Sequence, residues 1–123
     1  MHAELKRKID EVASECNAEG WDGYGAKAVM VAAVAAACAL ADALDSGLTV
    51  PEIGAEPDGV LTLEWYRSPR WTLSVSVHAD GLLHYAALFG PERICGTEVF
   101  RARMPQVLNE LITRIEQQDA ESF

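Results

Sequence analysis

Basic residues are scarce in this sequence. Ten lysines and arginines face nineteen aspartates and glutamates, which gives a formal charge of -9 at pH 7. Proteins that bind DNA or RNA use lysine and arginine to displace counterions from the phosphate backbone, so the composition argues against direct nucleic-acid binding. The excess of negative charge favours a basic protein partner, or it serves only to keep the chain soluble.

Cysteine is rare as well, and its three positions, Cys16, Cys38 and Cys95, form no close pair. An odd number at such spacings fits neither a disulfide framework nor a zinc site. No cluster of histidine, cysteine and carboxylate residues in the sequence has the spacing of metal ligands. We therefore expect three buried free thiols in a reducing compartment, with no metal and no cofactor.

Long hydrophobic runs are also missing. The longest stretch without a charged residue, residues 28–41, has 14 members, whereas a membrane-spanning helix needs about 20. The first residues, MHAELKRKIDEVASEC, are charged throughout and lack the apolar centre of a signal peptide. These two observations predict a cytoplasmic protein that does not contact membranes.

What the sequence does contain is enough apolar material for one core. Half of its 123 residues are hydrophobic, and this length is typical of a single domain. No internal repeat, low-complexity block or linker divides the chain. We expect one domain over residues 1–118, followed by an acidic tail at 119–123 that frays.

Periodicity predicts three helices. Apolar residues at spacings of three and four indicate an amphipathic helix over about residues 3–18. Alanine occupies about half of residues 27–45, which favours a second helix there. A third helix is expected after Pro105, which suits a first helical turn because it lacks an N–H group.

Between these helices the apolar period changes from 3.6 to 2. Strands are predicted at residues 61–66, 71–78, 82–89 and about 94–101, while the prolines of residues 49–60 argue for an extended connection. The fold class is therefore α+β, with two N-terminal helices, a four-stranded antiparallel meander and a C-terminal helix. We expect the helices to pack on one sheet face and to leave the other face, lined with threonine and serine, open.

Two motifs, GWDGYGA at residues 20–26 and PDGVLTLEW at 57–65, occur together and follow one another across a P-x-I segment. Together they resemble the signature of a family of small, largely uncharacterised bacterial proteins, in which WDGYGA is followed by PDGGI-x-LEW. Val60 stands where an apolar residue is usual, and Gly59 keeps the turn. The resemblance implies a soluble bacterial protein and supplies no catalytic residues.

The loop formed by Trp21, Asp22, Gly23, Tyr24 and Gly25 has two interpretations. Its glycines spell G-x-x-G-x-G after a helix instead of a strand, and the aspartate would repel an anion, which disfavours a phosphate site. We expect a structural corner in which Trp21 and Tyr24 are buried anchors and Asp22 accepts backbone N–H bonds or caps the second helix. The alternative is a small-molecule site, or a minor enzyme, between this loop and the sheet.

Four side chains are predicted on the open sheet face: Glu64, Tyr66, His78 and His84. Glu64 and His78 lie near opposite hairpin turns, too far apart for an acid–base pair, so we expect no catalytic residues. The placement of His84 depends on the second hairpin. A three-residue loop pairs Val77 with Leu83 and exposes His84. A two-residue loop instead pairs Val77 with His84 and buries the histidine, and we favour the first register.

Tyr66 is predicted to be exposed on this face, and the alternation of the strands places Val60, Leu82 and Leu88 on the same side. The face therefore has more apolar content than solubility requires. We therefore predict a small acidic interaction domain of adaptor, antitoxin or inhibitor type that binds a protein partner through the open face. A homodimer formed through an edge strand is a further expectation. Mimicry of nucleic acid by the acidic surface ranks lower, because the acidic residues are scattered.

Overall fold

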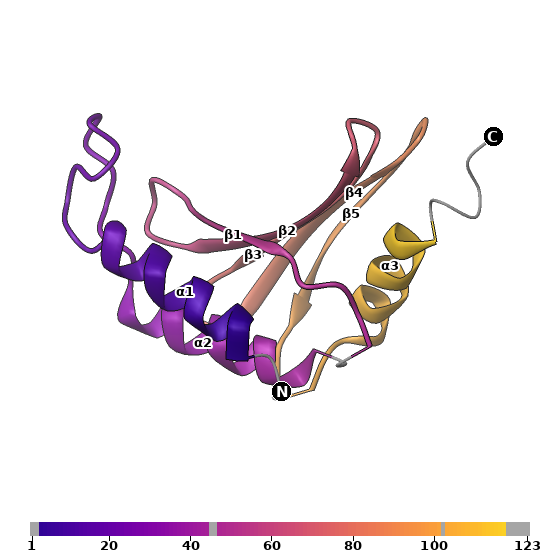
Figure 1. Ribbon diagram of the computed structural model, residues 1–123, viewed down its shortest axis with the longest axis horizontal. Coiled ribbons are helices and arrows are strands. Elements are labelled where there is room, and N and C mark those ends of the chain that lie inside the picture. Colours follow the sequence, from indigo (N-terminus) through magenta and orange to yellow (C-terminus); the bar gives the residue numbers. More distant parts are fainter. Residues whose placement is uncertain (1–2, 45–46, 102, 118–123) are drawn as a thin grey trace.

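The computed structural model describes residues 3–44, 47–101 and 103–117. The chain order is α1 (Ala3–Glu15), α2 (Val31–Ala43), β1 (Glu52–Ala55), β2 (Leu61–Ser68), β3 (Trp71–Val77), β4 (Leu82–Phe89), β5 (Glu92–Val99) and α3 (Gln106–Glu116). Figure 1 shows α1 running beside α2, with α3 well apart from both. The class is α+β, as predicted, and the tail expected at 119–123 lies outside the described residues.

The sheet has five antiparallel strands in the order β1-β2-β3-β4-β5, so the prediction of four is wrong by one. The missed strand is β1, in which Ile53 lies opposite Leu63. Pro51 and Pro57 flank this strand and do not interrupt its ladder, and it lies at the sheet edge, where proline is tolerated. The connection expected at residues 49–60 is therefore partly a strand.

Both N-terminal helices are shorter than predicted. The first ends at Glu15 instead of about residue 18, and the second begins at Val31 instead of residue 27. A loop over residues 16–30 separates them, and its two ends are joined by a hydrogen bond from the Val29 N–H to the Cys16 carbonyl at 2.9 Å. The end predicted for the second helix, residue 45, lies outside the described residues.

The fourth predicted strand is shifted by two residues. Phe89 lies directly opposite Glu92, so Gly90 and Pro91 alone make the turn, and β5 starts earlier than residue 94. Gly90 has a φ of 67°, a conformation that glycine adopts without steric cost. The third strand, at residues 82–89, has the predicted bounds.

One core joins all three helices to one alternating set of strand residues. Its strand members are Leu61, Leu63, Trp65, Leu73, Val75, Val77, Leu83, Ala87 and Phe89. Its members from the helices, with Leu44 at the C-cap of α2, are Leu5, Ile9, Ala37, Leu40, Ala41, Leu44, Leu108, Leu111, Ile112 and Ile115. Burying such aliphatic side chains contributes about 1.5–3 kcal/mol each, so this cluster is the main stabilising feature of the fold.

The other alternating set of strand residues forms what we call the outer face: Thr62, Glu64, Tyr66, Thr72, Ser74, Ser76, His84, Ala86, Leu88, Arg93, Cys95 and Thr97. These residues are exposed or half-buried. The face is rich in threonine and serine, as predicted. Among the residues that the structure describes, no helix is long and apolar enough to cross a membrane.

Candidate functional site

The four side chains predicted on the open face all lie on the outer face or at its end. Glu64 and Tyr66 come from β2, His84 comes from β4, and His78 follows directly after β3. Val77 lies opposite Leu83, which is the favoured register of the second hairpin and leaves His84 exposed. The Tyr66 side chain is 57% exposed.

The two histidines contact each other. The ring centroids of His78 and His84 are 4.5 Å apart, with the planes at 78° in an edge-to-face arrangement. His84 Nδ1 also lies 2.9 Å from the Thr97 hydroxyl on β5, and the ring tautomer decides which of the two donates. The histidines therefore form one cluster, while Glu64 lies in another cross-strand row, opposite Ser74.

Glu56, in the connection after β1, was missed by sequence reasoning. Its carboxylate accepts a hydrogen bond from the Thr62 hydroxyl and another, at 2.8 Å, from the Ser76 hydroxyl. The connection containing Glu56 was not expected to reach the outer face, since β1 itself was not predicted. The only signal in the sequence was that Thr62 and Ser76, on neighbouring strands, both place a hydroxyl group on the polar side of the sheet. Such hydroxyl groups need a hydrogen-bond acceptor nearby.

A carboxylate, a serine and two histidines thus lie on the same part of the sheet, but their hydrogen bonds do not form a catalytic triad. In a triad the imidazole accepts the serine proton and donates to the acid. Here Ser76 donates to Glu56, and His84 pairs with Thr97. Within the described ranges, no group of three histidine, cysteine or carboxylate residues is arranged to hold a metal ion.

A groove crosses the outer face over β3, β4 and β5. It has a volume of about 340 Å³, and its lining includes Thr72, Ser74, Ala86, Leu88, Arg93 and Cys95. The small side chains of Ser74 and Ala86, which lie opposite each other, leave the space that forms it. Tyr66 does not line the groove, but it lies opposite Thr72, which does, so an exposed aromatic residue is next to the groove on β2.

Of the three aliphatic residues expected on this face, Val60 is buried, whereas Leu82 and Leu88 are both half-buried. Val60 is only 4% exposed and packs in the turn before β2, where its carbonyl accepts a bond from the Glu56 N–H at 2.9 Å. Leu82 is half-buried at the start of β4. Leu88 is half-buried and lines the groove, as an apolar contact residue would.

The loop over residues 16–30 is closed by its own hydrogen bonds. The Gly20 N–H donates to the Ala26 carbonyl at 2.6 Å. One Asp22 oxygen accepts from the N–H groups of Tyr24 and Ala26, at 2.8 and 3.0 Å. The prediction that Asp22 accepts backbone bonds is confirmed, whereas its capping of the second helix is wrong, since Met30 occupies the cap position.

Only one of the two predicted aromatic anchors is packed. Trp21 is half-buried and donates its indole N–H to the Lys27 carbonyl at 2.7 Å. Tyr24 is 93% exposed, so its prediction as a buried anchor is wrong. It lies between Gly23 and Gly25, whose φ angles are 80° and 86°, in the loop over residues 16–30, which extends beyond both helices (Figure 1). The rest of the described fold leaves the ring uncovered there.

The segment that directly follows the first motif, residues 27–30, contacts the second motif. The Lys27 N–H donates to the Pro57 carbonyl at 2.7 Å, and the Met30 N–H donates to the Gly59 carbonyl at 3.1 Å. Gly59 has a φ of 93°, and a Cβ there would lie 2.9 Å from the Ala28 carbonyl oxygen. The segment after the first motif is therefore held against the turn of the second, where Gly59 allows close approach of two backbones.

No family model, curated protein or solved structure matches the chain. Its function is accordingly argued from its own residues.

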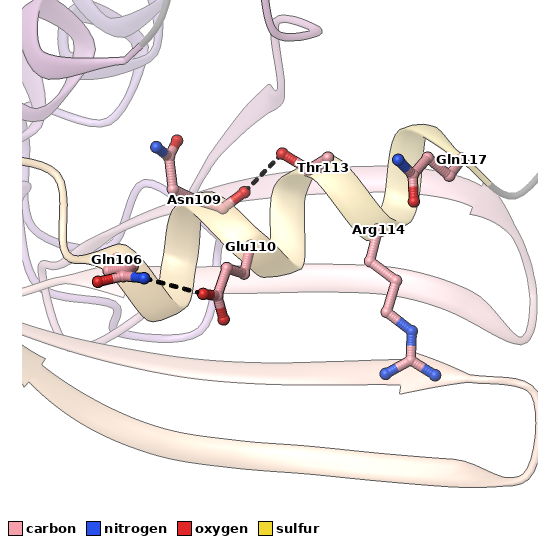
Figure 2. A pocket seen from close by; sticks show the side chains of 6 residues that line it. All are labelled: Gln106, Asn109, Glu110, Thr113, Arg114 and Gln117. Atoms are coloured by element: carbon pink, nitrogen blue, oxygen red, sulfur yellow. Dashed lines mark hydrogen bonds between the residues drawn. The ribbon is translucent and has the colours of Figure 1, made fainter.

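A larger hollow, of about 530 Å³, runs along α3 and was not predicted from the sequence. Figure 2 shows its lining side chains projecting from one side of the helix: Gln106, Asn109, Glu110, Thr113, Arg114 and Gln117. These groups bond to their own helix or sheet, since Gln106 donates to Glu110 at 3.1 Å and Arg114 contacts Glu92 at 2.6 Å. The outer-face groove, which brings apolar groups from three strands together, is the better candidate.

The cysteines are free, and they lie in different environments. Burial raises the pKa of the Cys16 thiol, and the nearby Glu15 carboxylate adds to the effect. Burial likewise raises the pKa of Cys38, with Asp10 as a further cause. Both therefore stay neutral thiols at pH 7 and are poor nucleophiles. Cys38 is half-buried and Cys95 is exposed on β5, so the expectation of three buried cysteines is confirmed for Cys16 alone.

Proposed function

We propose that the protein is a small acidic interaction domain, of adaptor, antitoxin or inhibitor type, that binds another protein through the outer face. The observation that carries the proposal is the apolar groove next to Tyr66. Contact surfaces combine an apolar centre with a polar rim and are enriched in tyrosine. If the three helices all cover the opposite face, as the shared core suggests, the outer face is the one broad sheet surface left to a partner.

The charges around Tyr66 favour a basic partner. Glu52 and Glu64 lie opposite each other on β1 and β2, and both are exposed. A lysine or arginine of the partner would place its charge near these carboxylates and its stem over the tyrosine ring. The formal charge of -9 would also accelerate association with a basic protein at low salt.

We further propose that the protein acts in a reducing compartment such as the cytoplasm. An exposed free thiol at Cys95 supports this location, since such a thiol oxidises readily elsewhere. The partner is therefore sought among soluble proteins of the same compartment.

A capture experiment with matched variants tests the proposal. The wild-type chain, Ala86→Arg and Tyr24→Ser are immobilised and exposed at low salt to a lysate of the encoding organism. Ala86 is exposed in the groove, so arginine there fills the groove and leaves the core intact. Tyr24 is the control because it is more exposed than Tyr66 and lies on the loop.

We expect the wild type and Tyr24→Ser to retain the same basic protein, and Ala86→Arg to lose it. With that partner purified, calorimetry should show at least a tenfold weaker affinity for Ala86→Arg, and weaker binding for all variants as salt rises, because charge attraction is screened. Equal binding by all three variants, or binding that Tyr24→Ser alone abolishes, would contradict the proposal.

A further inference from the structure

The two edges of the sheet differ in how well they are protected. At one edge, β1 has only four residues, lies between Pro51 and Pro57, and packs against α1. At the other edge, β5 has eight residues and contains no proline. Short strands, flanking prolines and covering helices are the usual protection against edge-to-edge pairing. The β5 edge has Pro91 directly before it, but the strand is twice as long as β1, and within the described residues it has no extensive contact with a helix.

The hydrogen bonds show which backbone groups of β5 face outward. The Phe100 N–H donates to the Gly81 carbonyl at 2.9 Å, so this pair is a hydrogen-bonded pair of the β4–β5 ladder. Such pairs alternate in antiparallel sheets, so even-numbered residues of β5 bond to β4. The N–H and C=O groups of the four odd-numbered residues therefore point to the open edge: Arg93, Cys95, Thr97 and Val99.

We propose that β5 is a dimer interface, in which a second copy of this chain adds its own β5 in antiparallel orientation around a two-fold axis at Gly96. The two sheets would then join into one sheet of ten strands. Both copies present the same outward-facing N–H and C=O groups on β5. One antiparallel pairing would therefore give hydrogen-bond partners to the open edges of both copies. This inference is independent of the partner proposed for the outer face.

The charge pattern of β5 is compatible with this register and disfavours the one shifted by a residue to Cys95. A two-fold axis at Cys95 would place Glu92 opposite Glu98 of the other copy, and like charges opposite each other destabilise a strand pair. An axis at Gly96 places Glu98 opposite Ile94 and Arg93 opposite Val99. No two charged residues of β5 are then opposite each other. Although each copy carries a charge of -9, the repulsion between the two copies is therefore small at this strand.

Tyr85 adds a contact at the proposed axis. It lies opposite Gly96, and its phenol group occupies the position that a side chain at residue 96 would fill, with Cζ 2.7 Å from the site of a Cβ. The ring therefore extends from β4 across β5 toward the open edge. In the dimer the two Tyr85 rings would meet over the axis, and aromatic pairs of this kind stabilise contacts.

Charge variants of Val99 test the inference. Their local pairing with Arg93 of the other copy should change the strength of dimerisation in the direction opposite to that expected from the change in net charge. Val99→Lys lowers the net negative charge of the chain but places lysine opposite Arg93 of the other copy. Val99→Glu raises the net negative charge but places a carboxylate opposite that arginine. Two such pairs per dimer should weaken or strengthen dimerisation by about 2- to 30-fold. Val31→Lys and Val31→Glu, at a side chain 85% exposed on α2, are the controls.

Sedimentation equilibrium of the full chain measures the outcome. We expect wild type to reach twice the chain mass of 13.4 kDa, with dimerisation strengthened by salt, since screening reduces the repulsion between like-charged copies. Val99→Glu should dimerise more tightly than wild type and Val99→Lys less tightly, while the Val31 variants follow net charge alone. A wild-type monomer at millimolar concentration, or Val99 variants that follow net charge, would overturn the inference.

Covalent trapping tests the register itself. In the proposed dimer Cys95 lies opposite Thr97 of the other copy, at the Cα separation that suits a disulfide. Oxidation of Thr97→Cys by air and a copper catalyst should give a covalent dimer on a non-reducing gel. Ser74→Cys, on the inner strand β3, should stay monomeric under the same conditions. Equal trapping of both variants would contradict the proposed pairing.

Discussion

Replacement of Gly59 by alanine tests how the turn before β2 packs against the segment at residues 27–30. This glycine lies in the turn before β2, and its carbonyl accepts a bond from the Met30 N–H at 3.1 Å. With a φ of 93°, it has a backbone conformation that side-chain-bearing residues rarely adopt. Alanine would also bring its Cβ to 2.9 Å from the Ala28 carbonyl oxygen, which is backbone and yields little.

The expected loss follows from these two effects. The unfavourable φ costs about 1–3 kcal/mol. Displacing the chain to relieve the Cβ contact would break the Met30–Gly59 hydrogen bond, which contributes about 1 kcal/mol. We therefore expect Gly59→Ala to lower the free energy of unfolding by about 2–4 kcal/mol, a large fraction of the 5–15 kcal/mol typical of a domain.

Two other glycines separate the effects. Gly23 has a φ of 80°, but no atom lies within 4 Å of the place that a Cβ would take, so Gly23→Ala should show the backbone cost alone, about 1–2 kcal/mol. Gly54 lies in β1 without a positive φ and with open space around it, so Gly54→Ala should be neutral or stabilise by up to about 1 kcal/mol.

Urea unfolding followed by tryptophan fluorescence measures all three variants. The predicted order of stability is Gly54→Ala, then Gly23→Ala, then Gly59→Ala. A Gly59→Ala variant within about 0.5 kcal/mol of wild type would refute the reasoning, since neither the φ angle nor the contact could then be as described. Equal losses at Gly23 and Gly59 would show that the close approach of Gly59 to Ala28 and Met30 contributes nothing.

Two further predictions concern the loop and the thiols. Asp22→Ala should lower the free energy of unfolding by about 1–3 kcal/mol in the same urea assay, because two backbone N–H groups lose their acceptor, and a neutral result would contradict the role of this carboxylate. At pH 7, a thiol reagent followed by mass spectrometry should label Cys95 before Cys16 and Cys38, whose pKa values are raised by burial. Since those two thiols ionise more readily in the unfolded chain, stability should fall as pH rises above about 8.5, the ordinary pKa of cysteine.

Local signals in the sequence predicted the central strands and the placement of Glu64, Tyr66 and His84. In β2, β3 and β4, apolar and polar residues alternate, and one face of each strand is buried, so the period of two marks both the strand and its faces. The strand β1 was missed because it has only four residues, EIGA, too few to establish a period of two, and because it stands between prolines. Its pairing is visible only once β2 is in place.

Tertiary contacts account for the other errors. Alanine content favours a helix from residue 27, but the N–H groups of Lys27 and Met30 bond to the turn at Pro57 and Gly59 instead. Tyr24 was expected to be buried because it is aromatic, yet the glycines beside it turn it away from the fold. The role of Glu56 depends on side chains that are distant in sequence, so no local pattern indicates it.

The most direct test of the proposed function is a nuclear magnetic resonance titration of the isotope-labelled chain with the purified partner from the capture experiment. The amide signals that shift on binding locate the contact surface residue by residue. We predict that they cluster on the outer face, around Tyr66, Ser74, Ala86 and Leu88. Shifts confined to the loop over residues 16–30 or to α3, with the outer face unchanged, would contradict the account.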